Sequence, residues 1–252
     1  IIVLDKENAQ NRKGIFMINA GEGFIKDGNK NRLREQDIKK ITDVFNDFIE
    51  VDGYSRMVSV VEIEQNEFNL NIPRYVDSNE TEDIQDIEAH LLGDIPTGDV
   101  DALGEYWKVY PSLKNSLFGA SERKKYSTLK VEKDAIKDTI FTHPEFVHFQ
   151  QEMDTIFDQW KTESIAKLKA IDTGSKPKEI IAELAHRLLT SYDDRDLIDK
   201  YDIYQYLMIY WNEAMQDDCY IISFDGWVAK THRVIEIKKK KEVDKGWDCD
   251  LV

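Results

Sequence analysis

The chain has 252 residues, of which 41% are hydrophobic, and a formal net charge of −15 at pH 7. This composition supplies a packed core and excludes disordered, collagen-like and low-complexity chains. No apolar run reaches the roughly 18 residues of a membrane-spanning helix, so we expect no membrane segment. The negative charge repels polyanions, which excludes strong DNA or RNA binding by this chain alone. Two cysteines, Cys219 and Cys249, make no disulfide framework, which indicates a reducing cytoplasm.

Residues 1–76 carry the pattern of a mixed α/β segment. Apolar runs over residues 1–5 and 14–19 predict two strands that pair antiparallel, and the 3.6-residue spacing over 34–48 predicts a helix. Residues 57–63 predict a strand that runs into a short helical turn. Isolated hairpins are marginal in water, so we expect a larger sheet whose other strands lie upstream in a longer protein. The open sheet edge could then pair two copies of the chain.

An acidic, polar stretch over residues 77–83 predicts a boundary between domains 1–76 and 77–252. The second domain is predicted to be mainly helical, and its long helices are expected over 146–168 and 203–215. Apolar runs on both sides of Asp225-Gly226 predict a small β-hairpin with its turn at this pair. The predicted fold class is therefore α+β, mainly α.

The segment Asn71-Ile72-Pro73-Arg74-Tyr75 is similar to the Asn-Pro-Pro-Tyr motif of amino-methyltransferases. In that motif the Asn side chain and the first Pro carbonyl accept hydrogen bonds from the target amine, and the aromatic ring stacks on the flipped base. Ile and Arg stand here in place of the two prolines, so this is not a catalytic loop. We expect a structural segment in which Arg74 is free to contact a phosphate or a carboxylate.

A second pattern, Asp225 with Glu236 and Lys238, has the spacing of Mg²⁺-dependent nucleases, in which two carboxylates hold the metal. No Pro precedes Asp225, and Lys238 opens a lysine run, so a turn and an exposed strand explain the pattern more simply. The histidines and cysteines lack the spacing of a zinc site. We assign no catalytic, cofactor-binding or metal-binding residue in this chain.

An ordered set of segments resembles the methyltransferase (M) subunit of type I restriction-modification enzymes. The segments, as they stand in this sequence, are residues 2–6, 12–20, 31–38, 54–56, 69–76, 87–91, 95–96, 101–107, 201–205, 215–218 and 245–251. They cover nearly the whole chain in the order expected for the C-terminal part of that subunit.

The resemblance implies that residues 1–76 end the catalytic α/β domain and that 77–252 form a helical domain for subunit interaction. In that family S-adenosylmethionine donates a methyl group to adenine, but the cofactor loop and the Asn-Pro-Pro-aromatic loop lie upstream of the matching part. The resemblance therefore implies S-adenosylmethionine for the full-length protein only, and we predict that this chain alone is inactive. It also implies the specificity (S) and restriction (R) subunits as partners, with DNA bound only through the complex.

The predicted helix over 203–215 carries Tyr204, Tyr210 and Trp211 over a wide arc. Aromatic side chains with a polar tip suit the centre of an interface. We therefore expect these three residues to contact the specificity subunit. Two other classes stay open: a Mg²⁺-dependent nuclease that uses Asp225, Glu236 and Lys238, and a free-standing helical interaction module.

Overall fold

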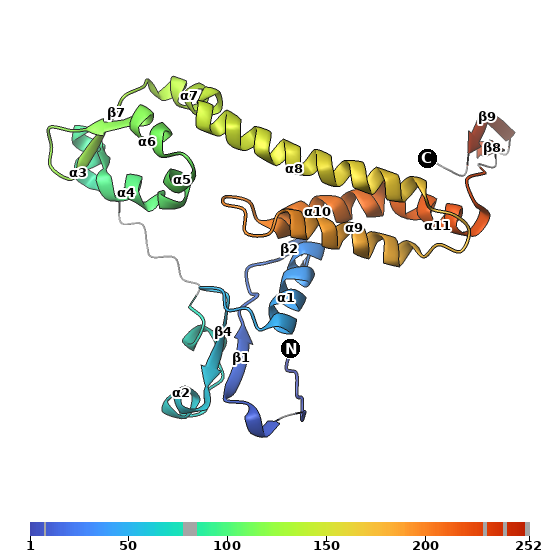
Figure 1. Ribbon diagram of the computed structural model, residues 1–252, viewed down its shortest axis with the longest axis horizontal. Helices are drawn as coiled ribbons and strands as arrows, with labels where there is room; N and C mark the ends of the chain where they lie inside the picture. The colour runs from blue at the N-terminus through green and yellow to red at the C-terminus, as the bar shows by residue number, and fades with distance from the viewer. Residues whose placement is uncertain (8, 78–84, 229–230, 239–240, 250–252) are drawn as a thin grey trace. The chain divides into compact units, whose positions relative to one another are not determined.

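The computed structural model describes residues 1–7, 9–77, 85–228, 231–238 and 241–249. The chain divides into two compact units, Ile1–Asp83 (unit 1) and Ile84–Val252 (unit 2), which are drawn in Figure 1. The elements of unit 1 are η1 (Ala9–Asn11), β1 (Gly14–Ile18), β2 (Ile25–Asp27), β3 (Lys30–Arg32), α1 (Glu35–Asp47), β4 (Ser55–Ser59), α2 (Val60–Gln65) and η2 (Ile72–Arg74).

In unit 1, β1 pairs antiparallel with β4, from Gly14 opposite Ser59 to Ile18 opposite Ser55. Gly14 permits this close approach, because a Cβ atom there would lie 2.0 Å from the carbonyl oxygen of Val58. The apolar side chains on one face of this pair are buried together with α2 and the segment after it. This core consists of Met17, Val58, Ile63, Tyr75 and Val76.

The predicted pairing of residues 1–5 with 14–19 is wrong. Residues 1–6 adopt no regular structure, and Ile1, Ile2, Val3 and Leu4 are exposed. β1 pairs instead with β4, because Val58 can pack against Met17 on the buried face. The predicted helix over 34–48 is confirmed as α1, and the predicted strand and helical turn over 57–63 are confirmed as β4 and α2.

Unit 2 begins with short helices around a small sheet and continues with long helices. Its elements are α3 (Ile87–Leu92), β5 (Ile95–Pro96), α4 (Thr97–Ala102), α5 (Gly104–Val109), α6 (Pro111–Leu117), β6 (Phe118–Ala120), β7 (Tyr126–Leu129), η3 (Lys133–Ala135), α7 (Ile136–Thr142), α8 (Pro144–Lys169), α9 (Pro177–Ser191), α10 (Lys200–Tyr210), η4 (Trp211–Met215), α11 (Gln216–Asp225), β8 (Thr231–Lys238) and β9 (Lys241–Cys249). The three-stranded sheet has the order β5-β7-β6 and is antiparallel.

The long helices of unit 2 lie side by side, with α8, α10 and α11 along α9 (Figure 1). Their common core includes Leu184, Leu188, Tyr204, Trp211 and Ile222. η4 is a single π-helical turn between α10 and α11, which continue the same helical path. Burial of one apolar stripe per helix is what holds such a bundle together.

The predicted hairpin at Asp225-Gly226 is wrong. The preceding run is the C-terminal part of α11, and the amide of Gly226 donates to the carbonyl of Ile222 at 2.8 Å. Gly226 has φ 78°, which is the conformation that glycine provides at helix ends. Ala229, which ended the predicted second strand, lies outside the described residues. The hairpin of this region is formed by β8 and β9 further along the chain.

The predicted class, α+β and mainly α, is confirmed by the predominance of helix and by sheets of two or three strands. In the described part of the chain, no helix combines the length and the apolar character that crossing a membrane requires.

Candidate functional site

The segment that resembles a methyltransferase motif is held against β4 by Arg56. The Arg56 guanidinium donates to the carbonyl of Tyr75 at 3.0 Å and to the carboxylate of Glu62 at 2.6 Å. The Tyr75 ring is buried, and its hydroxyl donates to the carbonyl of Asn69. A ring fixed in the core cannot stack on a flipped base, which agrees with the structural role expected for residues 71–75. The sequence showed Arg56 only as part of the resemblance, because its partners lie up to 19 residues away.

Arg74 lies on η2 with an exposed side chain. Within the described residues it makes no side-chain hydrogen bond or ion pair. Its guanidinium is therefore accessible to a phosphate or a carboxylate, and that role stays a prediction.

A groove of about 450 Å³ lies beside the same segment. Its lining residues are Glu50, Val51, Asp52, Gly53, Ser55, Arg56, Tyr75, Val76 and Asp77. Arg56 is already paired with Glu62, so the carboxylates dominate the charge of the lining. Such a groove disfavours phosphate groups and does not suit a nucleotide.

A polar cluster connects the loop before β2 to the start of α1. Arg34 and Asp37 form a capping box at the N-terminus of α1, and Asp37 is only 8% exposed. The hydrogen bond from the Arg34 side chain is the main reason why the pKa of Asp37 lies below its ordinary value. Gly23 lies against this carboxylate, since a Cβ atom there would be 2.8 Å from Asp37 Oδ1. The cluster is structural, because the carboxylate is already satisfied by its own helix.

The three aromatic residues expected at a partner interface lie in different environments. Tyr204 and Trp211 are 9% and 4% exposed and pack in the core of unit 2, whereas Tyr210 is 60% exposed. Tyr206 and Ile209, which we did not single out from the sequence, are also exposed, at 73% and 42%. Tyr206 and Tyr210 are four residues apart and share one side of α10. We call Tyr206, Ile209 and Tyr210 the α10 aromatic face.

A shallow groove of about 490 Å³ lies between the start of α9 and the end of α11. Tyr220 and Phe224 form its apolar part, and Ser175, Lys176, Lys178 and Glu179 are among its polar residues. Phe224 is highly exposed. Three residues further along the chain, Trp227 is fixed by a hydrogen bond from its Nε1 to the carbonyl of Ile171 at 2.6 Å.

The nuclease-like residues lie on separate elements. Asp225 ends α11, and Glu236 lies on β8, where its carboxylate is 3.4 Å from the Nζ of Lys245. The side chain of Lys238 lies outside the described residues. In the part of the chain that the structure describes, no three His, Cys, Asp or Glu side chains form a group that could hold a metal ion. Cys219 is a buried free thiol, and burial raises its pKa, which makes it a poor nucleophile.

The N-6 DNA Methylase family matches residues 1–84, which coincide with unit 1 to within one residue. The remaining residues of unit 2 lie outside this match. The match therefore falls on the unit that consists of a pair of strands with α1 and α2.

Three relatives are methylase subunits of type I restriction enzymes. The MjaVII subunit of Methanocaldococcus jannaschii is 37% identical over 95 residues, which is 36% of this chain and 16% of the relative. The MjaVIII subunit of the same organism is 34% identical over 91 residues, covering 34% of this chain and 16% of the relative. The MpnII subunit of Mycoplasma pneumoniae is 31% identical over 97 residues, covering 38% and 18%.

These matches confirm the resemblance to type I methylase subunits over 34% to 38% of the chain, and the resemblance of the other segments stays a prediction. The aligned part spans less than a fifth of the length of each relative. No solved structure matches the chain significantly.

Proposed function

We propose that this chain is the C-terminal part of the methyltransferase subunit of a type I restriction-modification enzyme. Unit 1 completes the catalytic domain, and unit 2 docks the specificity subunit. The family match over residues 1–84 carries this proposal, together with the names of the relatives. The full-length protein would act in the cytoplasm and methylate adenine with S-adenosylmethionine.

The residues present do not fit a role in cofactor binding or catalysis. No Gly-rich cofactor loop and no Asn-Pro-Pro-aromatic loop occur in this sequence. The chain alone is therefore proposed to be inactive. Calorimetry with S-adenosylmethionine should show no saturable heat, and micromolar binding would contradict this part of the proposal.

The α10 aromatic face supports the docking role of unit 2. Two exposed tyrosines and an isoleucine on one helix side offer a contact with an apolar body and polar tips. DNA and the restriction subunit would then be reached through the assembled complex. A separate DNA-reading subunit also explains how a chain of charge −15 can serve DNA methylation. A second copy of the chain could pair at the open edge of β1.

Capture of the specificity subunit of the same system tests the docking role. Tyr210→Ala should weaken capture by a factor of about 30 if it is a hot spot, which corresponds to about 2 kcal/mol. Tyr206→Ala should weaken it in the same direction. Tyr106→Ala is the matched control, since Tyr106 is 52% exposed on α5, away from the α10 aromatic face in sequence and element. Equal capture by all three variants would remove the α10 aromatic face from the interface.

A further inference from the structure

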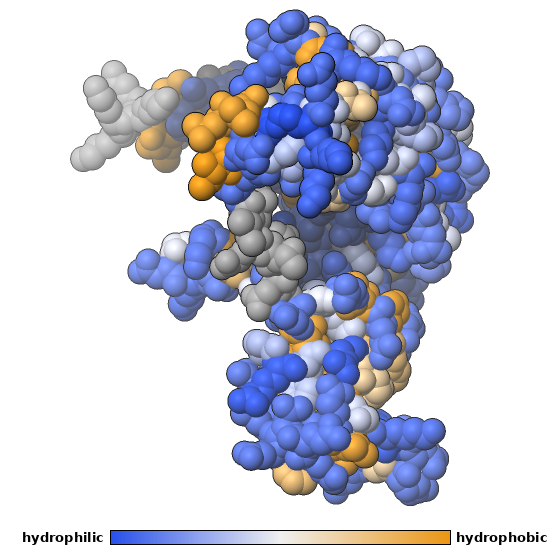
Figure 2. Space-filling view, turned by 90° about the vertical axis from the view of Figure 1, so that its left-hand side faces the viewer, coloured by the Kyte–Doolittle hydropathy of each residue, from blue (hydrophilic) through white to orange (hydrophobic). Residues whose placement is uncertain are grey.

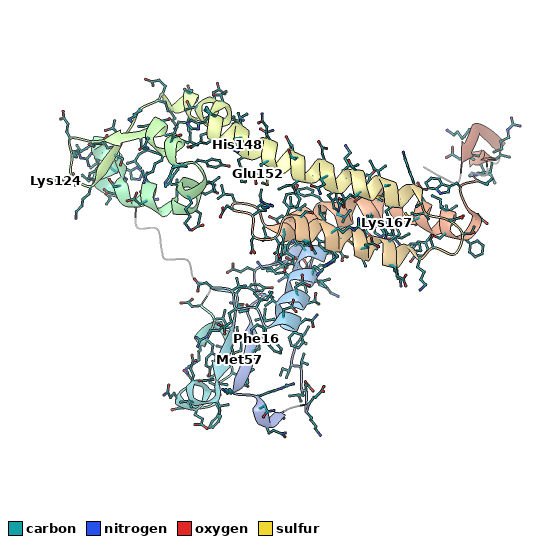
Figure 3. All side chains as sticks on the ribbon, in the orientation of Figure 1. Phe16, Met57, Lys124, His148, Glu152 and Lys167 are labelled. Carbon is teal, nitrogen blue, oxygen red and sulfur yellow. The ribbon has the colours of Figure 1, made fainter. Side chains whose placement is uncertain are left out.

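The turn between β6 and β7 carries three consecutive basic residues, Arg123, Lys124 and Lys125. Lys124 and Lys125 lie at its tip with exposed side chains, and within the described residues neither makes a side-chain hydrogen bond or an ion pair. Figure 3 labels Lys124 at the outer end of this part of unit 2. The face of the molecule that Figure 2 shows is mostly hydrophilic, with apolar patches among the polar side chains.

Arg123, the first basic residue of the turn, is held inward. Its guanidinium donates to the carbonyl of Gly93 at 2.7 Å, lies 3.2 Å from the carboxylate of Glu88, and covers the ring of Tyr126 at 3.8 Å from the ring centre. The Tyr126 hydroxyl in turn donates to Asp86 at 2.8 Å. Of the acids near the turn, Glu88 is thus paired with Arg123, and Asp86 accepts a hydrogen bond from Tyr126.

Asp94 anchors both sides of the turn. Its carboxylate accepts hydrogen bonds from the hydroxyls of Ser121 at 2.6 Å and Thr128 at 3.0 Å. The Ser121 hydroxyl also accepts from the amide of Arg123 at 3.0 Å. Hydrogen bonds through Asp94 and Ser121 therefore hold the two ends of the turn together. The two lysines remain at the tip, where Glu122 is the neighbouring exposed acid in the chain.

Lys125 has a left-handed backbone conformation with φ 70°, which is uncommon for a residue other than glycine. Its carbonyl accepts a hydrogen bond from the amide of Thr97 at 2.8 Å, which fixes this conformation. Strained residues that the surrounding structure holds in place cluster at functional sites. The conformation presents two adjacent lysines on a fixed support instead of a mobile loop.

We propose that Lys124 and Lys125 contact the phosphate backbone of DNA when the chain is assembled in its complex. This inference rests on the proposed function, because it takes DNA methylation as the context. Lysine is a point charge that suits phosphate oxygens. The contact does not read sequence, because Arg123 covers the aromatic ring of the turn and no exposed ring there can stack on a base.

The test compares two double variants in the complex of the full chain with its specificity subunit. Lys124→Gln/Lys125→Gln removes two charges from the tip. Lys161→Gln/Lys169→Gln removes two charges from exposed positions on α8, whose side chains make no hydrogen bond or ion pair within the described residues. Both variants change the net charge equally, so general repulsion between the chain and DNA changes by the same amount. A difference between them reports local contacts.

The measurement is the dissociation constant for a short DNA duplex at a series of salt concentrations. Each lost phosphate contact reduces the slope of log affinity against log salt by about 0.9, so the tip variant should lose about 2 units of slope. The loss should be the same for duplexes with and without the recognition sequence. The control variant should keep the wild-type slope. The same series with the isolated chain at low ionic strength should show the same order of affinities.

Equal slopes for the two double variants would overturn the inference. If the tip variant instead fails to capture the specificity subunit while the control captures it, the lysines bind an acidic protein surface and the DNA contact is wrong. If the tip variant captures the specificity subunit normally and keeps the wild-type salt slope, the inference is wrong, but the proposed function is unaffected. Failure of the proposed function itself would appear as no capture by the wild-type chain.

Discussion

The guanidinium of Arg34 binds both carboxylate oxygens of Asp37, with Nε to Oδ2 and Nη2 to Oδ1 each at 2.9 Å. The backbone amide of Arg34 donates to the same carboxylate at 2.8 Å. The Asp37 carboxylate thus accepts the backbone amide at the start of α1, and the Arg34 guanidinium neutralises its largely buried charge. This pair decides how unit 1 responds to mutation and to pH.

Replacement of Asp37 by Asn should destabilise unit 1 by about 2 kcal/mol, because charge-assisted hydrogen bonds to a buried carboxylate are lost. Hydrogen exchange of the α1 amides measures this directly. Tryptophan fluorescence would not, since the five tryptophans all lie in unit 2. Asp47→Asn, at the exposed end of the same helix, is the control and should change protection little. Equal protection in both variants would contradict the role of Asp37.

The same pair predicts a loss of stability in acid. The pKa of Asp37 lies below its ordinary value of 3.8, mainly because of the Arg34 side-chain hydrogen bond. A lowered folded-state pKa stabilises the fold at pH values above the ordinary one, and this contribution disappears as the pH falls through the folded-state pKa. Protection of α1 should therefore decrease below about pH 4, and the Asp37→Asn variant should lack this part of the decrease. Parallel pH profiles for the two proteins would disprove the linkage.

Gly23→Ala should destabilise unit 1 by roughly 1–3 kcal/mol, because the added methyl group would lie 2.8 Å from Asp37 Oδ1. Gly98→Ala is the matched control, because no atom lies within 4 Å of the position of its added Cβ. In the Asp37→Ala background the clash is relieved, so the Gly23→Ala cost should shrink. An unchanged cost there would show that the strain arises elsewhere.

Trp211→Ala should destabilise unit 2 by about 3–5 kcal/mol, because a large, 4% exposed side chain is removed from the core. Tyr210→Ala should change stability by no more than about 0.5 kcal/mol, because the Tyr210 side chain is 60% exposed. Urea unfolding followed by circular dichroism separates the two outcomes. Similar costs for both residues would place Tyr210 in the core as well.

The carboxylate of Glu145, near the start of α8, accepts hydrogen bonds from the Ser112 hydroxyl at 2.6 Å and from the amides of Ser112 and Leu113 at 3.1 Å. It thereby caps the N-terminus of α6 from another helix. Glu145→Gln should cost about 1–2 kcal/mol in the unfolding of unit 2, measured by tryptophan fluorescence. Glu163→Gln is the control, because its exposed ion pair with Arg187 contributes little. If Glu163→Gln costs as much, the cap contributes nothing specific.

The sequence alone determined the helices with a clear apolar stripe and the relationship to methylase subunits. The spacing of apolar residues predicted α1, α8 and the strand-to-helix step from β4 to α2, because an amphipathic element carries its own period. The ordered segments indicated the family because they do not depend on which side chains touch.

Only the tertiary structure decided which strand pairs with β1, whether Asp225-Gly226 forms a hairpin turn or a helix end, and which aromatic residues are exposed. Residues 1–5 and 55–59 are both suited to a strand, and burial of Val58 against Met17 selects the second. An Asp-Gly pair suits a hairpin turn and a helix end alike, and the continuation of the helix through η4 selects the helix end. Tyr204, Tyr210 and Trp211 lie on one helix, but only its packing against α9 determines which rings are buried. Strand pairing, helix termination and side-chain burial depend on contacts between distant residues, which a local sequence pattern does not contain.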